Sequence, residues 1–155
     1  MIYKIIEKII NWLLNLLGTN NNQSTTKEEK IYRKRNFMSE IELDFYNKIK
    51  ELENEYKIIP QINLGTIVEK QNKGYRNELF RNIDFAIFDK DLKELLILIE
   101  LNDKTHEQRK RRKRDKNVKE ICEKANIKLI TFYTKYPNKV DYVLNRIKEE
   151  IKKTI

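Results

Sequence analysis

The chain has 155 residues, which is enough for one modest domain with a hydrophobic core and additional terminal segments. Its 39% apolar and 37% charged residues are typical of a soluble globular protein with a heavily charged surface. The formal net charge of +9 favours a polyanionic partner, either nucleic acid or an anionic membrane surface. A single His and a single Cys exclude an internal disulfide and a structural zinc site of the usual Cys and His type.

Residues 2–17 are predicted to form an apolar helix. Its polar side chains recur at helical spacing and form one narrow stripe, which consists of Lys4, Glu7, Lys8, Asn11 and Asn15. A membrane-spanning helix needs about 20 apolar residues, whereas this run is shorter and contains charges. No small-residue cleavage site follows it, so we do not expect a removed signal peptide. Two interpretations stay open: an interfacial anchor that holds a cytoplasmic protein at the inner face of the membrane, and a helix that packs on a partner.

A polar segment of low complexity begins at Gly18 and continues to about Phe37. It has little apolar surface to bury, which is typical of a flexible linker. We therefore expect three parts: the apolar helix in residues 1–18, the linker in residues 19–37 and a compact α/β domain in residues 38–155.

The compact domain is predicted to contain the element order α-β-β-β-α-β-α, a small sheet flanked by helices. Ser39 and Glu42 have the spacing of a capping box and predict the start of the first helix. The strand at residues 58–64 contains Pro60, which favours an edge position. A second capping box at residues 105–108 predicts a helix that reaches about Ala125. The other expected features are Ile41, Phe45, Ile49 and Leu52 on one face of the first helix, strands within 83–89, 95–103 and 128–133, and a last helix with Val140, Val143, Leu144, Ile147 and Ile151 on one face.

Two acidic residues stand at the polar ends of neighbouring apolar runs. Asp84 begins the run that ends near Asp89, and Glu100 ends the run that begins at Leu95. The link between the runs is short enough for a hairpin, so the two strands are predicted to be antiparallel neighbours with Asp84 beside Glu100. Ionised carboxylates this close repel each other unless a cation lies between them. The pattern therefore predicts a divalent-metal site.

The predicted helix after Glu100 is basic on every side in its N-terminal half, at residues 109–116. Its apolar residues occupy only the C-terminal half, so the basic half has no face to bury. A solvated helix end is one interpretation, and contact with the phosphates of a nucleic acid is the other. The side chains expected to contact phosphates are Arg109, Arg111, Arg112, Arg114, Lys116 and Lys119.

Several short segments, taken in order, resemble the domain-of-unknown-function family 2726 over residues 38–135. These segments are Glu42 with Phe45 and Tyr46, Pro60-Gln61, Ile83-Asp84-Phe85, Ile99-Glu100-Leu101-Asn102-Asp103 with His106, and Arg114-Asp115. That family is placed in the restriction-endonuclease-like PD-(D/E)XK superfamily, and its motif order is similar to that of the very-short-patch repair endonucleases. The resemblance implies a three-layer α/β/α core with a mixed four-stranded sheet. It also implies magnesium-dependent hydrolysis of phosphodiester bonds in DNA.

The resemblance also implies a set of site residues. Asp84 and Glu100 match the ligands of a Mg²⁺ or Mn²⁺ ion, and the Leu101 carbonyl would be a third ligand. Glu42 matches the acid of the first helix that reaches the metal through water, although a capping-box acid alone is an equal interpretation. The lysine that the superfamily has two residues after its second acid is replaced by Asn102.

Neighbouring residues bear on the same site. His106 follows Glu100 closely and is expected to shuttle a proton or contact phosphate, with a solvated surface residue as the alternative. Asp103 is either a ligand or a helix cap, and many family members have Arg where this chain has Thr131. The positive charge of the lysine that Asn102 replaces could come instead from one of three residues, which are Lys104, Lys116 and Lys119.

Three functions follow from these observations. The leading one is a metal-dependent DNA endonuclease whose catalytic residues are Asp84, Glu100, Asn102, His106 and Glu42. The second is a nucleic-acid-binding protein on an inactive nuclease fold, motivated by Asn102. The third is a membrane-peripheral adaptor that docks through residues 2–17 and the basic segments.

Overall fold

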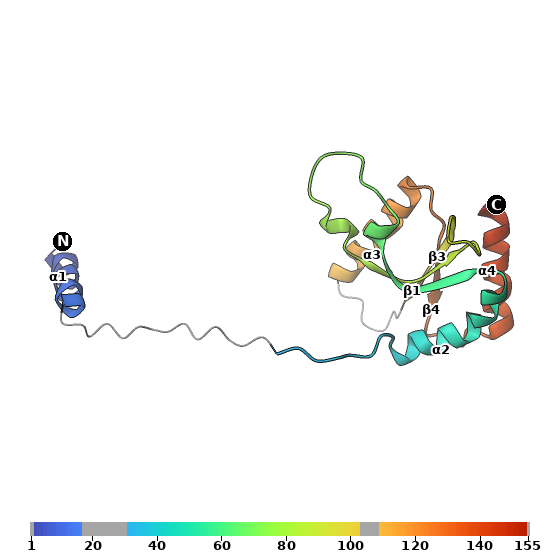
Figure 1. Cartoon of the computed structure of the whole chain (residues 1–155), viewed down its shortest axis with the longest axis horizontal. Helices are drawn as coiled ribbons and strands as arrows, with labels where there is room; N and C mark the ends of the chain where they lie inside the picture. The colour runs from blue at the N-terminus through green and yellow to red at the C-terminus, as the bar shows by residue number, and fades with distance from the viewer. Residues whose placement is uncertain (1, 17–30, 103–108, 155) are drawn as a thin grey trace. The chain divides into compact units, whose positions relative to one another are not determined.

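The computed structural model describes residues 2–16, 31–102 and 109–154 of the chain (Figure 1). The chain divides into two compact units, Met1–Arg35 and Asn36–Ile155. In the described part of the first unit, helix α1 spans Ile2–Leu16. None of the helices in these ranges combines the length and the hydrophobicity that a membrane span requires.

The second unit is built around a four-stranded sheet in the order β1-β2-β3-β4. Its strands are β1 (Lys57–Asn63), β2 (Asn82–Phe88), β3 (Leu95–Asn102) and β4 (Leu129–Tyr133). The first three strands are antiparallel, and β4 runs parallel to β3. The predicted mixed four-stranded sheet is therefore confirmed. Pro60 lies on an edge strand, as its missing N–H led us to expect.

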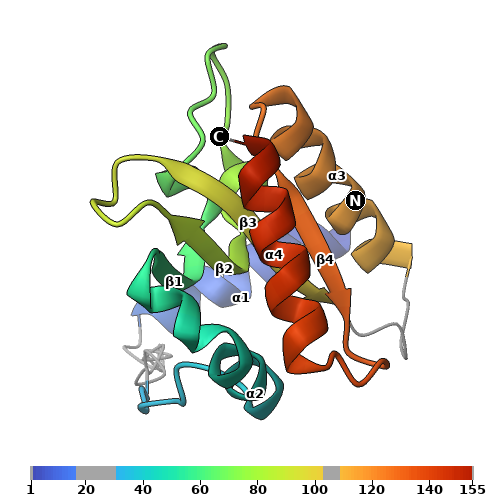
Figure 2. The ribbon, with the colours of Figure 1, turned by 90° about the vertical axis from the view of Figure 1, so that its right-hand side faces the viewer.

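Helices cover both faces of this sheet (Figure 2). Helix α2 (Glu40–Ile49), which continues into a 3₁₀ turn at Lys50–Asn54, packs with α4 (Val140–Thr154) in one core cluster. Helix α3 (Arg109–Lys124) contributes Val118 and Cys122 to a second cluster on the other face. The element order matches the predicted α-β-β-β-α-β-α.

The two clusters follow from the alternation of side chains along a strand. On β3, Ile97 and Ile99 belong to the α2–α4 cluster, whereas Leu98 between them belongs to the α3 cluster. On β4, Ile130 and Phe132 belong to the α2–α4 cluster. These assignments fix the face on which each neighbouring polar residue lies.

The helix starts predicted from the sequence have mixed outcomes. The first capping box is confirmed, because Ser39 Oγ accepts the Glu42 N–H at 3.3 Å and Glu42 Oε2 accepts the Ser39 N–H at 2.6 Å. The second capping box, at residues 105–108, lies outside the described residues. Two residues expected on buried helix faces are largely exposed: Ile41 at 52% and Val140 at 44%. Both lie in the first turn of their helices, and the later apolar positions of α2 and α4 are the ones that reach the core.

Candidate functional site

The pairing of β2 with β3 ends one residue short of Asp84 and Glu100. Strands β2 and β3 are antiparallel, as the sequence predicted, and Phe85 pairs with Ile99. The next residues along the two strands are Asp84 and Glu100. Residues directly opposite in an antiparallel pair have their side chains on the same face, with Cβ atoms about 5 Å apart. Continued by one residue, this register would set the two carboxylates opposite each other at one end of the sheet.

Glu100 lies on the face of the sheet that α3 covers. Glu100 follows Leu98 by two residues, and Leu98 belongs to the α3 cluster. Cys122 on α3 has its pKa raised to about 11, first by burial and then by the negative charge of Glu100. Both observations assign Glu100 to the α3 face.

Asp84 also holds the end of β3. Its Oδ2 accepts the Leu101 N–H at 2.6 Å. On the β4 side of β3, the Leu98 N–H donates to the Lys128 carbonyl and the Asn102 carbonyl accepts from the Thr134 N–H. The backbone groups of Leu101 therefore face β2. The Asp84 carboxylate thus accepts the Leu101 N–H, which in a regular strand pair would donate to a main-chain carbonyl of β2. The Leu101 carbonyl, which points to the same side as its N–H, faces the strand that carries Asp84.

The edge strand is irregular beside the same point. Pro60 pairs with Phe85 and Ile62 pairs with Ile83, so the register sets Gln61 opposite Asp84. Gln61 has a φ of 54°, a left-handed conformation that costs a residue other than glycine about 1–3 kcal/mol. Strain of this kind is often found at functional sites.

Gln61 connects this irregular strand position to helix α2. Its Nε2 donates to Glu42 Oε1 at 2.8 Å, while the other oxygen of Glu42 accepts from Ser39. Glu42 therefore accepts hydrogen bonds from both Ser39 and Gln61. Gln61 is the residue that the β1–β2 register sets opposite Asp84. The sequence named Gln61 only through a resemblance. Its one local signal was a polar residue directly after the proline of a strand.

The donor set suits a hard divalent cation. Asp84, Glu100 and the Leu101 carbonyl offer only oxygen atoms, which Mg²⁺ and Mn²⁺ prefer, and Mg²⁺ completes its coordination with water. Within residues 2–16, 31–102 and 109–154, no group of three or more His, Cys, Asp or Glu side chains is placed to hold a metal. Asp103 and His106, which the sequence added to the site, lie outside the described residues. The role of all these residues as ligands stays a prediction.

The neighbouring strand β4 gives the site hydroxyl groups rather than a cation. Thr131 pairs with Glu100 and Tyr133 pairs with Asn102. Because Ile130 and Phe132 point to the α2–α4 side, Thr131 and Tyr133 lie on the same face as Glu100. The sequence analysis did not propose Tyr133, although the alternation along residues 128–133 was a signal that would have placed it.

The structure describes two of the three lysines that could replace the absent positive charge at position 102. Lys119 is exposed and pairs with Glu123 at 3.7 Å along α3. Lys116 is exposed on the same helix, and Lys104 lies outside the described residues. The α3 backbone begins at Arg109, and the side chains of Arg109, Arg111, Arg112 and Arg114 are outside the described part of the structure.

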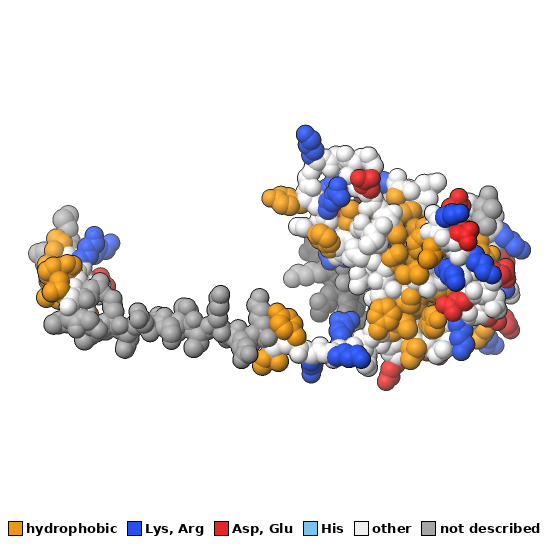
Figure 3. Space-filling model, in the orientation of Figure 1, with side chains coloured by type: hydrophobic (Ala, Val, Ile, Leu, Met, Phe, Trp, Pro, Cys, Tyr) orange, Lys and Arg blue, Asp and Glu red, His pale blue; other side chains and the backbone are white. Residues whose placement is uncertain are grey.

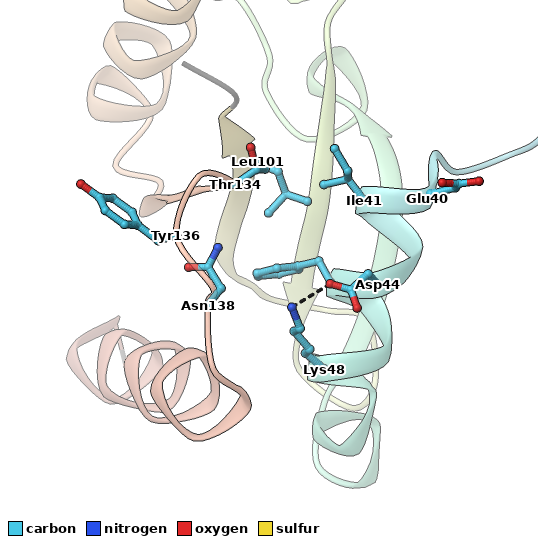
Figure 4. A pocket seen from close by; sticks show the side chains of 9 residues that line it. Glu40, Ile41, Asp44, Lys48, Leu101, Thr134, Tyr136 and Asn138 are labelled. Atoms are coloured by element: carbon cyan, nitrogen blue, oxygen red, sulfur yellow. Dashed lines mark ion pairs between the residues drawn. The ribbon is translucent and has the colours of Figure 1, made fainter. Parts of the chain in front are cut away.

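A pocket of about 320 Å³ lies on the other side of β3, between α2 and the segment after β4 (Figure 4). Its lining includes the ion pair of Asp44 with Lys48 at 2.7 Å and the side chain of Leu101. Leu101 packs against the α2–α4 cluster, whereas Glu100 lies on the α3 face. Glu100 is therefore separate from this pocket.

The pKa of the Cys122 thiol offers a test of the position of Glu100. Replacing Glu100 by glutamine removes the charge that raises this pKa, so we expect the pKa to fall from about 11 while staying above the usual value because of burial. Alkylation by iodoacetamide should then be faster at each alkaline pH. The chain has one Cys, so the reacting thiol is unambiguous.

Glu123→Gln is the matched control for this measurement, because Glu123 is a weaker cause of the same shift. Saturating Mg²⁺ should lower the Cys122 pKa in the wild type if the ion binds Glu100, and it should have no effect on the Glu100→Gln variant. An alkylation profile that Glu100→Gln leaves unchanged would contradict the placement of Glu100 beside α3.

A family model described as "Protein of unknown function (DUF2726)" matches residues 34–154. No curated protein and no solved structure matches the chain. The matched residues include the whole sheet, the three helices α2–α4 and both carboxylates. The chain therefore belongs to the DUF2726 family of proteins of unknown function, as its motifs indicated.

Proposed function

We propose that this protein is a metal-dependent nuclease that hydrolyses phosphodiester bonds in DNA. The observation that supports this most strongly is the pairing of β2 with β3 up to Phe85 and Ile99, which makes Asp84 and Glu100 the next residues of two neighbouring strands, with Asp84 bonded to the Leu101 N–H. The net charge of +9 and the basic half of α3 favour a polyanionic substrate.

The proposed roles follow from the positions of the residues. Asp84, Glu100 and the Leu101 carbonyl would hold Mg²⁺ or Mn²⁺. When bound, such an ion lowers the pKa of a water molecule and neutralises charge on the phosphate. Asp84 also fixes the end of β3 through the Leu101 N–H. Glu42 is held by Gln61 and Ser39 on α2, across the sheet from the α3 face, so we propose that it would reach the metal only through water at the end of the sheet.

Asn102 has a different role from the lysine that it replaces. Its amide can donate to a phosphate oxygen but has no charge. Thr131 beside Glu100 is also neutral. The positive charge that stabilises the transition state is therefore expected from α3, and His106 is proposed to transfer a proton to the leaving oxygen.

Incubation of the purified protein with linear, nicked and single-stranded DNA tests this proposal. We expect cleavage with Mg²⁺ or Mn²⁺ and none with EDTA. If all three substrates stay intact with either ion, the proposed catalytic activity is wrong.

A nucleic-acid-binding protein without catalysis is the second candidate, and the neutral residues Asn102 and Thr131 at the site favour it. Calorimetry separates the two functions. The nuclease should release or absorb heat when titrated with Mn²⁺, and this heat should disappear in Asp84→Ala. A protein that only binds nucleic acid should show no such heat.

The basic half of α3 is predicted to contact phosphates. Replacing Arg111, Arg112 and Arg114 by glutamine removes three phosphate contacts and should roughly halve the slope of log affinity against log salt. Fluorescence anisotropy with a DNA duplex in EDTA measures this slope. Replacing Lys148, Lys152 and Lys153 on α4 removes the same charge from the opposite side of the sheet and is the control. An unchanged slope in the arginine variant would refute the contact.

We also propose that α1 attaches the protein to the surface of a membrane. Its apolar side chains are exposed around most of its circumference, and Lys4 and Lys8 lie in the polar stripe, where they can meet anionic headgroups. A short helix with so wide an apolar face is better covered by lipid than by one partner helix.

Replacing Ile5 and Ile9 by serine should lower binding to anionic vesicles by about tenfold or more for each side chain, because each buried isoleucine contributes about 1.5–3 kcal/mol. Co-sedimentation measures this binding, and the fluorescence of the sole tryptophan, Trp12, reports insertion. Asn11→Ser in the polar stripe is the control. Wild-type protein that stays in the supernatant with an unmoved spectrum would exclude the anchor.

A further inference from the structure

Residues 64–81 form the loop between β1 and β2 (Figure 1). Two aromatic side chains of this loop are exposed. Tyr75 is 87% exposed and Phe80 is 66% exposed. Orange and blue side chains project from this loop in the space-filling view (Figure 3). Large rings this exposed have little to do with the stability of the domain, so a binding partner is the explanation that we consider.

The base of this loop is held in place by hydrogen bonds. The Leu64 N–H donates to the Arg81 carbonyl at 2.7 Å, and Asn63 Nδ2 donates to Asn82 Oδ1 at 3.1 Å. Leu64 and Leu79 are buried in the α3 cluster. The loop therefore leaves the sheet on the side that carries Glu100.

The tip of the loop is also held together. Lys70 Nζ donates to the Tyr75 carbonyl at 2.9 Å and pairs with Glu78 Oε1 at 2.7 Å. Gly74 between them has a φ of 142°, which strains any other residue. These contacts present Tyr75 on a defined turn, so less conformational entropy is lost when its ring is covered.

Basic side chains alternate with the two rings. Lys73, Arg76 and Arg81 are exposed on either side of Tyr75 and Phe80. A ring offers a stacking surface to any base, and nearby cations contact the phosphates that join successive bases. Rings and cations arranged in this way favour single-stranded nucleic acid, whose bases are free to stack on protein, over a duplex, whose bases stack on one another.

The loop is close enough to the carboxylates to contact the same strand of nucleic acid. Phe80 precedes Asp84 by four residues, which span at most about 14 Å of extended chain. Successive nucleotides of a stacked strand rise about 3.4 Å each, so that distance corresponds to about four nucleotides.

We propose that the β1–β2 loop is a binding site for unpaired bases, with Tyr75 and Phe80 as stacking surfaces and Lys73, Arg76 and Arg81 as phosphate contacts. This inference rests on the proposed function, because it takes nucleic acid as the ligand. It specifies the substrate as DNA with a single-stranded segment within a few nucleotides of the bond that is cut.

The test compares the wild type with the double variant Tyr75→Leu/Phe80→Leu in EDTA, where no cleavage occurs. Anisotropy measures the affinity for a single-stranded oligonucleotide and for the duplex of the same sequence. We expect the single-strand affinity to fall by about fivefold to 150-fold per ring. The duplex affinity and the salt slope of both should change little, because leucine removes no charge. Quenching of 2-aminopurine in the oligonucleotide should also be lost.

Two controls separate stacking from other effects. Tyr142→Leu removes an exposed ring from α4, on the opposite side of the sheet, and should bind both ligands as the wild type does. Tyr75→Phe keeps a ring and should retain quenching.

The outcomes distinguish this inference from the proposed nuclease. Wild-type protein that binds single strands in a ring-dependent way but does not cut DNA supports the loop site and contradicts the nuclease. Wild-type protein that cuts DNA while the leucine variant binds single strands as tightly as before overturns the loop site alone. Equal losses for single strands and duplex would also overturn it, because rings that stack on unpaired bases should not weaken binding of a duplex to the same extent.

Discussion

Replacing Asp84 by asparagine is expected to lower the rate of metal-dependent DNA cleavage by about 10³-fold or more. Removing one stabilising group from an active site typically costs up to about this factor. Asparagine keeps an oxygen that accepts the Leu101 N–H, so the end of β3 should stay in place. It removes the negative charge that a divalent cation requires. Binding of DNA in EDTA should be unchanged or stronger, because one charge that repels phosphate is gone.

The matched control for this variant is Asp89→Asn. Asp89 follows β2, and its Oδ1 accepts the N–H groups of Lys93 and Glu94 at 2.6 and 2.8 Å in the hairpin. Both substitutions therefore replace by an amide a carboxylate that accepts backbone hydrogen bonds, and the two positions lie toward opposite ends of β2. Cleavage should survive at position 89 and disappear at position 84. Equal activity of the two variants would show that Asp84 is not part of a catalytic site.

The parts of the fold that depend on local patterns were predictable from the sequence. The capping box at Ser39, the edge position of Pro60 and the hairpin between β2 and β3 each depend on residues that are close in the chain. The opposition of Asp84 and Glu100 follows from that hairpin. A short link between two apolar runs leaves few ways to pair them, so the antiparallel neighbour was accessible, whereas the register shift between Ile87 and Phe88 has no signal in the sequence.

Contacts between distant segments were not predictable in the same way. The hydrogen bond of Gln61 with Glu42 joins an edge strand to a helix, and the left-handed conformation of Gln61 has no sequence signature of the kind that glycine provides. Likewise, the pairing of Thr131 with Glu100 depends on the crossover through α3, which sets the register of β4. The exposed rings of the β1–β2 loop were also missed, because the sequence does not tell whether Tyr75 and Phe80 are buried.

We expect Glu100→Gln to be more stable than the wild type in EDTA and less stable than the wild type with a divalent metal. Without metal, like charges directly opposite in an antiparallel pair destabilise it by about 0.2–1 kcal/mol. Glu100→Gln should therefore raise the free energy of unfolding by up to that amount in EDTA. With Mg²⁺ or Mn²⁺ at about 100 times the dissociation constant, the wild type should gain about 2.7 kcal/mol and the variant little.

Urea denaturation in EDTA and in excess Mn²⁺ measures both effects, and Glu55→Gln, an exposed carboxylate beyond the first 3₁₀ turn, is the control. The wild type should be the less stable protein in EDTA and the more stable one in Mn²⁺, whereas Glu55→Gln should follow the wild type in both. This reversal needs no catalysis, so it tests whether the carboxylates share a cation even if the protein cuts nothing. A variant that is less stable than the wild type in EDTA, with no response of either protein to metal, would mean that Glu100 serves the fold through its other contacts and that the two carboxylates do not form a metal site.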